Sequence, residues 1–427
     1  MKITIWNKKF SMIYEFVTAK KGDDFVGFRA DNKKIEINLP IGYEISEDQL
    51  SLISENELRK KITELVFVIA EFKEKKEGSF QSFVVTKNNK QCNFPISACL
   101  YLIKDYFQNG YYKTKEITIS KGNSGKINWA KTIKNVKPEL TKSLEPIYLD
   151  YFIRKSKVND HKLISEIHKY CVWYAFNTIG FLFSSFIPKQ PSIKYDKKLF
   201  INVIKHNLKN TFAQKELFLF QNMLALLEKW DDDLSFDKVI FGTTDFEHVW
   251  EHMIDIAYGE TGIFNKEDFF PYAEWHLNNV SGNAGNLYPD TICLFSQEKL
   301  HGCIIIDAKY YGYKDINYKT LPSMESIAKQ IHYGQYVFKK ASNFGIESPN
   351  TLIFNVFLIP ANFSSKKNTK KPCYIGYAIE PWNDNEKMFE KIFCFAIDCQ
   401  SLINNFSKDK ERVDLLLREL RNQTMQT

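Results

Sequence analysis

Two short apolar runs, each bounded by an aspartate, constrain the fold of this 427-residue chain more than any other feature. Asp290 precedes Thr-Ile-Cys-Leu-Phe, and after a polar turn at 296–302 the run Cys-Ile-Ile-Ile leads into Asp307. Runs of this length and composition predict two buried strands joined as a hairpin. In an antiparallel pair the start of one strand and the end of the next lie at one sheet edge, so the carboxylates are expected to converge.

Lys309 follows Asp307 at a spacing of two residues, which predicts that both side chains lie on one face of the strand. Two carboxylates and an amine suit the hydrolysis of a phosphodiester. A hard cation neutralises charge on the phosphate, and a nearby group positions or deprotonates water. We therefore predict Mg²⁺ on Asp290 and Asp307, with Lys309 at the nucleophile. The alternative is a surface hairpin with ordinary charges.

A helix expected at 245–257 offers a third acid for this site. Glu247 and Glu251 are one turn apart, so both lie on one helix face and either can reach the metal. We favour Glu247 as the catalytic acid and keep Glu251 as a candidate metal ligand. His248 and His252 also have the i, i+4 spacing of a zinc site, and ordinary surface histidines are the alternative.

The strongest local positive charge lies at 121–142, where six lysines face a single acid, Glu139. One interpretation is a DNA-contacting surface in which lysines bind phosphates beside an aromatic ring. The other is a solvated face around one buried tryptophan. The candidate DNA-binding residues of this segment are Lys126, Trp129, Lys131 and Lys134. The chain lacks the GxxxxGK[ST] spacing that cradles nucleotide phosphates, so it is not expected to bind NTP itself.

The chain is long enough for two or three domains, because one hydrophobic core rarely organises more than about 250 residues. Strand-like runs alternate with helical spacing, which predicts a multi-domain α/β protein. We expect a mixed α/β region at 1–110 that reads DNA sequence, a basic linker and helical region at 111–235 that contacts DNA, and a nuclease domain at 236–427. In that last domain we expect a central mixed sheet flanked by helices.

Residues 170–188 carry no charged side chain and almost reach the length of about 20 residues that a bilayer helix requires. Asn177, Thr178 and Gly180 interrupt this stretch, and no second span follows, so a buried core helix is the better interpretation. No signal-peptide pattern is present at the N-terminus. The eight cysteines show neither CxxC nor Cys/His metal spacing. We expect a cytoplasmic protein without a membrane partner.

These residues resemble the PD-(D/E)XK nuclease superfamily and, within it, the LlaJI-type restriction endonucleases, which are related to McrC-like nucleases. The resemblance spans roughly 120–360, and the first 110 residues match nothing that we can name. The segments that carry it follow in the family's order, as Gly125-Lys126-Ile127-Asn128-Trp129, Phe246-Glu247, Tyr288-Pro289-Asp290, Asp307-Ala308-Lys309 and Lys329-Gln330.

The resemblance implies a type II restriction enzyme that cuts both DNA strands with Mg²⁺, with catalytic roles for Asp290, Asp307 and Lys309. Gln330, on the helix after the core, either contacts the scissile region or caps a neighbouring carbonyl. Because one chain carries one site, a homodimer on DNA is expected, and a separate DNA methyltransferase is the expected companion. The alternatives are an McrC-like nuclease subunit driven by a separate NTPase on modified DNA, and a catalytically inert DNA-binding module.

Overall fold

The computed structural model describes residues 2–7, 12–31, 34–45, 54–75, 80–86, 91–159, 162–184, 186–228, 236–259, 265–278, 280–297, 300–312, 321–344, 351–363, 369–383 and 387–425. The chain forms two compact units. One unit combines residues 1–91 with 235–427, and the other is 92–234. The second unit is therefore inserted between two parts of the first.

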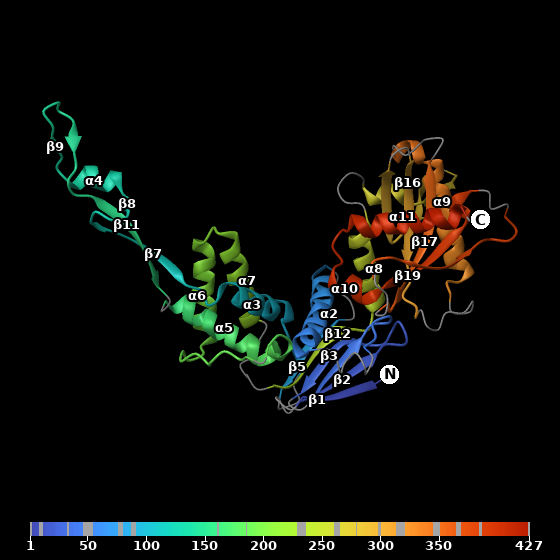
Figure 1. Ribbon diagram of the computed structural model, residues 1–427, viewed down its shortest axis with the longest axis horizontal. Coiled ribbons are helices and arrows are strands. Elements are labelled where there is room, and N and C mark those ends of the chain that lie inside the picture. The colour runs from blue at the N-terminus through green and yellow to red at the C-terminus, as the bar shows by residue number, and fades with distance from the viewer. Residues whose placement is uncertain are drawn as a thin grey trace. The chain divides into compact units, whose positions relative to one another are not determined.

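The first sheet of the larger unit combines N-terminal strands with one strand from the middle of the chain. Its order is β1-β2-β4-β3-β12-β5-β6 (Figure 1). The strands are β1 (Lys2–Asn7), β2 (Met12–Thr18), β3 (Val26–Asp31), β4 (Lys34–Leu39), β5 (Phe80–Thr86), β6 (Gln91–Asn93) and β12 (Phe236–Thr243). β12 pairs antiparallel with both β3 and β5, so the chain returns to this sheet after the inserted unit. Helix α2 (Glu55–Lys75) packs against β3 and β12.

The second sheet of the larger unit carries the hairpin with the two aspartates. Its order is β15-β16-β17-β19-β18, and the central pairs β16–β17 and β17–β19 are parallel while both outer pairs are antiparallel. The strands are β15 (Thr291–Gln297), β16 (Leu300–Ala308), β17 (Leu352–Ala361), β18 (Cys373–Ala378) and β19 (Ile392–Asp398). The associated helices are α8 (Phe246–Tyr258), α9 (Met324–Lys339), α10 (Cys399–Asn404) and α11 (Lys410–Met425).

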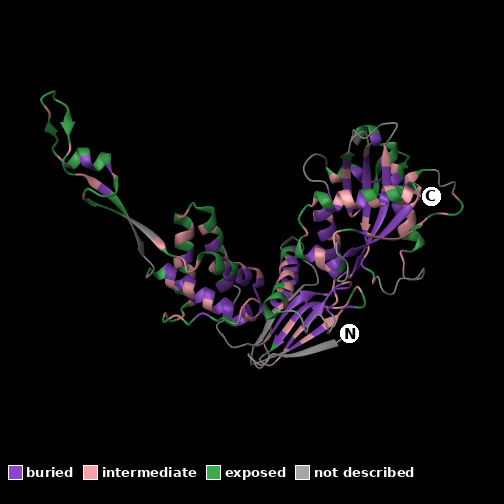
Figure 2. Ribbon diagram, in the orientation of Figure 1, coloured by how far each residue is buried: buried purple, intermediate pink, exposed green. Residues whose placement is uncertain are grey.

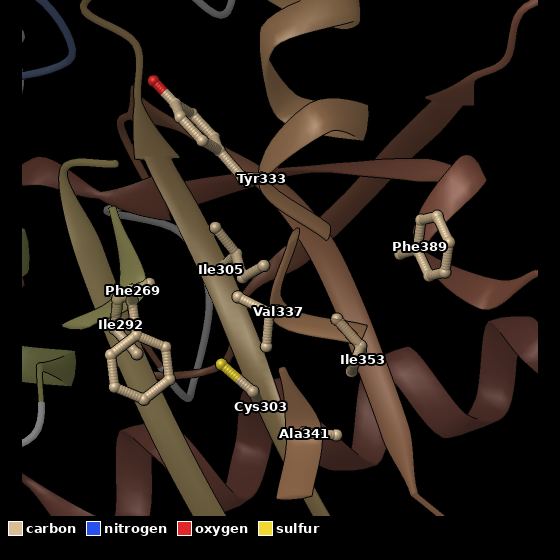
Figure 3. Close-up of a cluster of buried hydrophobic side chains, with 9 residues drawn as sticks. All are labelled: Phe269, Ile292, Cys303, Ile305, Tyr333, Val337, Ala341, Ile353 and Phe389. Atoms are coloured by element: carbon tan, nitrogen blue, oxygen red, sulfur yellow. The ribbon is translucent and has the colours of Figure 1, made fainter. Parts of the chain in front are cut away.

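Both faces of the inner strands β16, β17 and β19 are buried, as their uninterrupted apolar runs require. Cys303 and Ile305 pack with Tyr333 and Val337 of α9 in one apolar cluster (Figure 3). Ile304 and Ile306 point to the opposite face by the period of two and are also fully buried. Helix α8 contacts β15 and β16, and α9 contacts β16, β17 and β19. Asp307 therefore continues the strand face that α9 covers.

The second unit consists of helices and a narrow strand assembly. The helices are α3 (Ile96–Asn109), α5 (Leu163–Ile179), α6 (Lys197–Asn210) and α7 (Gln214–Glu228), together with the short α4 (Trp129–Asn135). The strands are β7 (Thr114–Lys121), β8 (Lys126–Ile127), β9 (Glu139–Leu140), β10 (Pro146–Ile147) and β11 (Phe152–Asn159). β11 lies between β7 and β8. Exposed residues dominate the segment of α4 and β9 (Figure 2).

The multi-domain α/β architecture expected from the sequence is confirmed, including the central mixed sheet flanked by helices. Two elements were not predicted. They are the exposed hairpin of β13 (Tyr272–Leu277) and β14 (Val280–Asn286), and β19, which lies between β17 and β18 in the second sheet. Across the described residues no helix has the length and apolar character to cross a bilayer, and α5 is a largely buried helix.

Candidate active site

The structure brings the two aspartates of the hairpin together at one edge of the second sheet. Asp290 directly precedes β15, Asp307 is the penultimate residue of β16, and the register opposes Thr291 to Ile306. Asp290 Oδ2 accepts a hydrogen bond from the backbone N–H of Ala308 at 2.8 Å. The carboxyl groups of Asp290 and Asp307 also share a hydrogen bond. The antiparallel pairing thus places both acids within direct contact, as the sequence pattern predicts.

The proximity of the two acids changes their protonation. Burial, followed by the charge of Asp307 and the hydrogen bond between the two carboxyl groups, raises the pKa of Asp290 to about 8. The charge of Glu251 acts in the same direction, and the N–H of Ala308 acts in the opposite one. Two ionised carboxylates in contact repel each other, so Asp290 without a bound cation holds a proton at neutral pH.

Lys309 completes the group that the sequence predicts. Its Nζ lies 2.9 Å from Asp307 Oδ2, and its side chain is 21% exposed. Its backbone N–H donates to the carbonyl of Leu358 at 2.9 Å, which extends the β16–β17 ladder past the end of β16. Burial alone would lower the pKa of Lys309, but the charges of Asp307 and Asp290 outweigh it and the pKa is raised. Lys309 is therefore a fixed cation beside the carboxylate pair.

The two glutamates of α8 have different surroundings. Glu251 is the one whose charge acts on Asp290, and its Oε2 lies 3.1 Å from His248 Nδ1. Glu247 is exposed, and its Oε2 would lie 3.6 Å from a Cβ placed on Gly22 in the connection between β2 and β3. These surroundings favour Glu251 as the helix acid of the carboxylate pair, whereas the sequence argument favoured Glu247.

A divalent cation fits the carboxylate pair by its chemistry. Mg²⁺ is commonly held by one or two carboxylates together with water and substrate phosphate. Asp290 and Asp307 supply two such groups, and their mutual repulsion is what a cation would remove. Within the described parts of the chain, no three His, Cys, Asp or Glu side chains group closely enough to form a metal site. The two histidines of the alternative zinc site have different partners. The ring of His252 packs against the ring of Phe72 with centroids 5.3 Å apart, and His248 Nδ1 lies 3.1 Å from Glu251 Oε2.

Two side chains of α9 support the strand that carries Asp307. Gln330 is fully buried, and its Nε2 donates to the carbonyl of Ile305 at 2.8 Å. This burial leaves Gln330 as a support of β16, which agrees with the carbonyl-capping alternative and places its amide out of reach of DNA. One turn later the hydroxyl of Tyr333 donates to the carbonyl of Tyr288 at 3.2 Å. Burial, then the charges of Asp307 and Asp290, raises the pKa of Tyr333 to about 12.

Lys266 is a third supporting residue, and it was not identified from the sequence. It lies in the short helix η2 (Lys266–Phe269). Its Nζ donates to Asp255 Oδ1 of α8 at 2.8 Å and also to the backbone carbonyl of Asp290. The ammonium group therefore ties α8 to the residue that carries one of the two carboxylates. No spacing rule links these positions, because η2 lies in an irregular connection. For Tyr333, the position one turn after Gln330 on the same helix face was the available signal.

The lysine-rich segment of the second unit is exposed. Lys126, Lys131 and Lys134 are exposed, and Trp129 is 51% exposed. The ring of Trp129 packs edge-on against Tyr151 at 5.9 Å. Because half of its surface is exposed, Trp129 is not the buried tryptophan of the solvated-face interpretation. Lys131 Nζ lies 5.0 Å above the ring of Phe152. The segment thus presents lysines and a half-exposed indole together.

Comparisons with known proteins identify a family, a curated relative and solved structures that resemble this chain. The LlaJI restriction endonuclease family model matches residues 25–371, which begins well before the motifs of the resemblance. The type II restriction enzyme BsuMI component YdjA of Bacillus subtilis (strain 168) is 26% identical over 281 residues, covering 61% of this chain and 57% of the relative. The aligned region therefore spans little more than half of that relative's length.

One of the solved structures that resemble this chain is a Thermococcus gammatolerans assembly of McrB AAA+ hexamers with bound McrC. The match has 12% sequence identity and a TM-score of 0.35, and it covers 93% of this chain and 82% of the other. A likeness at this level supports no functional conclusion.

Proposed function

Because this chain belongs to the LlaJI restriction endonuclease family, we propose that it is a type II restriction endonuclease that hydrolyses DNA phosphodiester bonds with Mg²⁺. The observation that carries this proposal is the convergence of three side chains. Asp290 and Asp307 share a hydrogen bond, and Lys309 Nζ lies 2.9 Å from Asp307. Paired carboxylates with an adjacent cation suit a reaction in which negative charge develops on a phosphate.

Mg²⁺ held by Asp290 and Asp307, when bound, would neutralise charge on the scissile phosphate. Lys309 keeps its proton because the neighbouring carboxylates raise its pKa. Its ammonium group therefore donates a hydrogen bond to the attacking water or a phosphate oxygen and orients it, rather than removing a proton. The bond from the Ala308 N–H holds Asp290 in place, and the bond from Gln330 holds Ile305 two residues before Asp307.

The assembly on DNA is part of the same proposal. One site cuts one strand, so double-strand cleavage at a specific sequence would use two copies of the chain or two successive nicks. Residues 1–110 would read the sequence, and the segment with Lys126, Trp129, Lys131 and Lys134 would contact the DNA backbone. A separate DNA methyltransferase would protect the host sequence.

A second candidate is a nuclease chain that works only with other chains. The name of the curated relative describes it as a component of a type II restriction enzyme, and this observation favours a multi-component system. In this version the chain supplies the hydrolytic site and a separate subunit, such as an NTPase that acts on modified DNA, drives cleavage. The site residues keep the same roles in both candidates.

The test is cleavage of supercoiled plasmid by the purified full-length chain, with Mg²⁺ or with EDTA. Linear product in Mg²⁺ alone supports the independent endonuclease, and sequencing its ends gives the recognition site. Activity that appears only with companion chains and NTP supports the component. DNA binding without cleavage under every condition would leave the inert DNA-binding module and overturn the proposed hydrolytic function.

A further inference from the structure

The connection between β2 and β3 places two lysines beside the proposed active site. Lys20 and Lys21 are both exposed, and Gly22 follows them. A Cβ placed on Gly22 would lie 3.6 Å from Glu247 Oε2 and 3.9 Å from Cδ1 of Tyr310. Glu247 lies on α8, the helix that also carries Glu251. Tyr310 directly follows Lys309 beyond the end of β16. The connection between β2 and β3 thus lies against α8, which packs on the second sheet of the larger unit.

The backbone of this connection is fixed. Asp24 Oδ2 accepts hydrogen bonds from the backbone N–H groups of Lys20 at 2.6 Å and Lys21 at 3.0 Å. These two bonds lower the pKa of Asp24, so its carboxylate stays charged at neutral pH. The backbone N–H of Ala19 donates to the carbonyl of Leu39 on β4 at 2.8 Å. The two lysine side chains therefore project from a position that the fold defines.

Three further contacts hold the first sheet of the larger unit, with the segment that follows β4, against the second sheet. The hydroxyl of Tyr310, one residue after Lys309, accepts a hydrogen bond from the backbone N–H of Ile41 at 2.7 Å. Asn362 Nδ2 donates to the carbonyl of Glu44 at 3.2 Å. Gly42 has φ +77°, and a Cβ there would lie 2.8 Å from the backbone N of Ala361. The distance from Lys20 and Lys21 to the active site is consequently set by direct packing.

The local charge indicates what these lysines bind. Helix α8 and the hairpin present four acids near one another, and DNA approaches them only if positive charge offsets the repulsion. Lys309 is paired with Asp307, Lys266 with Asp255, and Lys329 with Glu325. Across the described residues, no ion pair engages the ammonium group of Lys20 or Lys21, so both are available to an anion from outside.

We propose that Lys20 and Lys21 bind DNA backbone phosphates next to the scissile bond, so that the N-terminal sheet forms one wall of the nuclease site. This inference rests on the proposed function. Glu247 lies one helical turn, about 5.4 Å, from Glu251, and Glu251 acts on Asp290. A phosphate bound by these lysines is thus a near neighbour of the one that is cut. Contacts of this kind position the duplex and carry no sequence information themselves.

The test uses the full-length chain with Asp307→Asn as a background that binds without cutting. Lys20→Ala with Lys21→Ala is compared with Lys339→Ala and Lys340→Ala, an adjacent exposed lysine pair at the end of α9. The dependence of duplex binding on salt is measured on several unrelated sequences. Loss of two phosphate contacts should reduce the slope of log K against log salt by about 2, equally for every sequence. The control pair should leave the slope unchanged.

In the otherwise wild-type chain the Lys20 and Lys21 double variant should raise KM for DNA with little change in kcat, and Lys20→Arg with Lys21→Arg should restore binding. An unchanged salt slope, or an equal loss in the control pair, would overturn the inference while leaving the cleavage function intact. If the wild-type chain neither binds nor cuts duplex DNA, the inference falls together with the proposed function.

Discussion

Asp290 Oδ2 accepts a hydrogen bond from the backbone N–H of Ala308 at 2.8 Å, which locks the residue before β15 to the residue between Asp307 and Lys309. This contact joins the start of the hairpin to its end. It holds the carboxylate of Asp290 against the end of β16, where Asp307 and Lys309 stand on either side of Ala308 in the chain. The distance between the two carboxyl groups is therefore set by sheet register rather than by flexible side chains.

Asp290→Asn should stabilise the metal-free protein. The pKa of Asp290 is raised to about 8 from an ordinary value of 3.8. Between these values the unfolded chain ionises this group while the folded protein keeps its proton, so wild-type stability falls as pH rises through the window. The amide retains the bond from Ala308 and cannot ionise, so the gain in unfolding free energy should grow from pH 4 to pH 8.

Urea unfolding of wild type and Asp290→Asn at several pH values measures this gain, with Asp268→Asn as an exposed-acid control. Mg²⁺ should raise the Tm of the wild type, and the Asp290→Asn variant should lose that rise. A gain that does not depend on pH would show that Asp290 is ionised without metal, contrary to the proton-holding pair described above.

Glu251→Gln should impair Mg²⁺-dependent cleavage more than Glu247→Gln. Glu251 is the helix acid whose charge acts on Asp290, whereas Glu247 contacts the connection at Gly22. The two variants are matched in chemistry and lie one turn apart on α8. Cleavage rates at saturating DNA, measured over a range of Mg²⁺ concentrations, compare them. A larger loss for Glu247→Gln would reverse the assignment.

Lys309→Met should lower the cleavage rate at least about 100-fold, because removing one charged group that acts in the transition state typically costs that much. DNA affinity should change little, because the Lys309 side chain is only 21% exposed and is paired with Asp307. Single-turnover cleavage with a parallel binding assay measures both quantities. Full activity in Lys309→Met would mean that water is positioned by another group.

The stability of the second unit should depend on pH through His168. Burial lowers the pKa of His168 from 6.5 to about 4, and its Nδ1 accepts a hydrogen bond from the backbone N–H of Tyr112 at 3.0 Å. The folded protein excludes the proton that the unfolded chain binds below pH 6.5, so stability falls as pH drops from 6.5 towards 4. The full loss is about 3 kcal/mol for a shift of this size.

His168→Gln keeps an acceptor for the Tyr112 N–H and does not titrate. Its unfolding free energy should therefore decline less than that of the wild type between pH 7 and pH 4, as measured by urea denaturation followed by circular dichroism. Parallel declines in the two proteins would show that His168 is protonated in the folded state.

The hairpin with its two aspartates could be predicted because its information is local. Apolar runs of strand length and a short polar turn fix the pairing, and the register then brings the carboxylates together. A helix that carries Gln330 was likewise expected after the hairpin, and it is α9. The resemblance to the LlaJI-type restriction endonucleases is confirmed by the family match over residues 25–371.

The remaining features depend on contacts between distant parts of the chain. β12 enters the N-terminal sheet about 200 residues after β3, and no local pattern specifies that partner. β19 is buried at every position, so it shows no alternation from which its place between β17 and β18 could be inferred. We also could not predict that Lys266, Lys20 and Lys21 lie near the site, because they come close to it only when the two sheets pack together.

The most direct test of the central claim compares wild type with Asp307→Asn in Mg²⁺, with cleavage of plasmid and binding of duplex DNA measured on the same preparations. The substitution removes one charge of the carboxylate pair while preserving side-chain size. The account predicts that Asp307→Asn binds DNA as well as the wild type and cuts it at a rate reduced by at least about 100-fold. Cleavage by Asp307→Asn at the wild-type rate would contradict it.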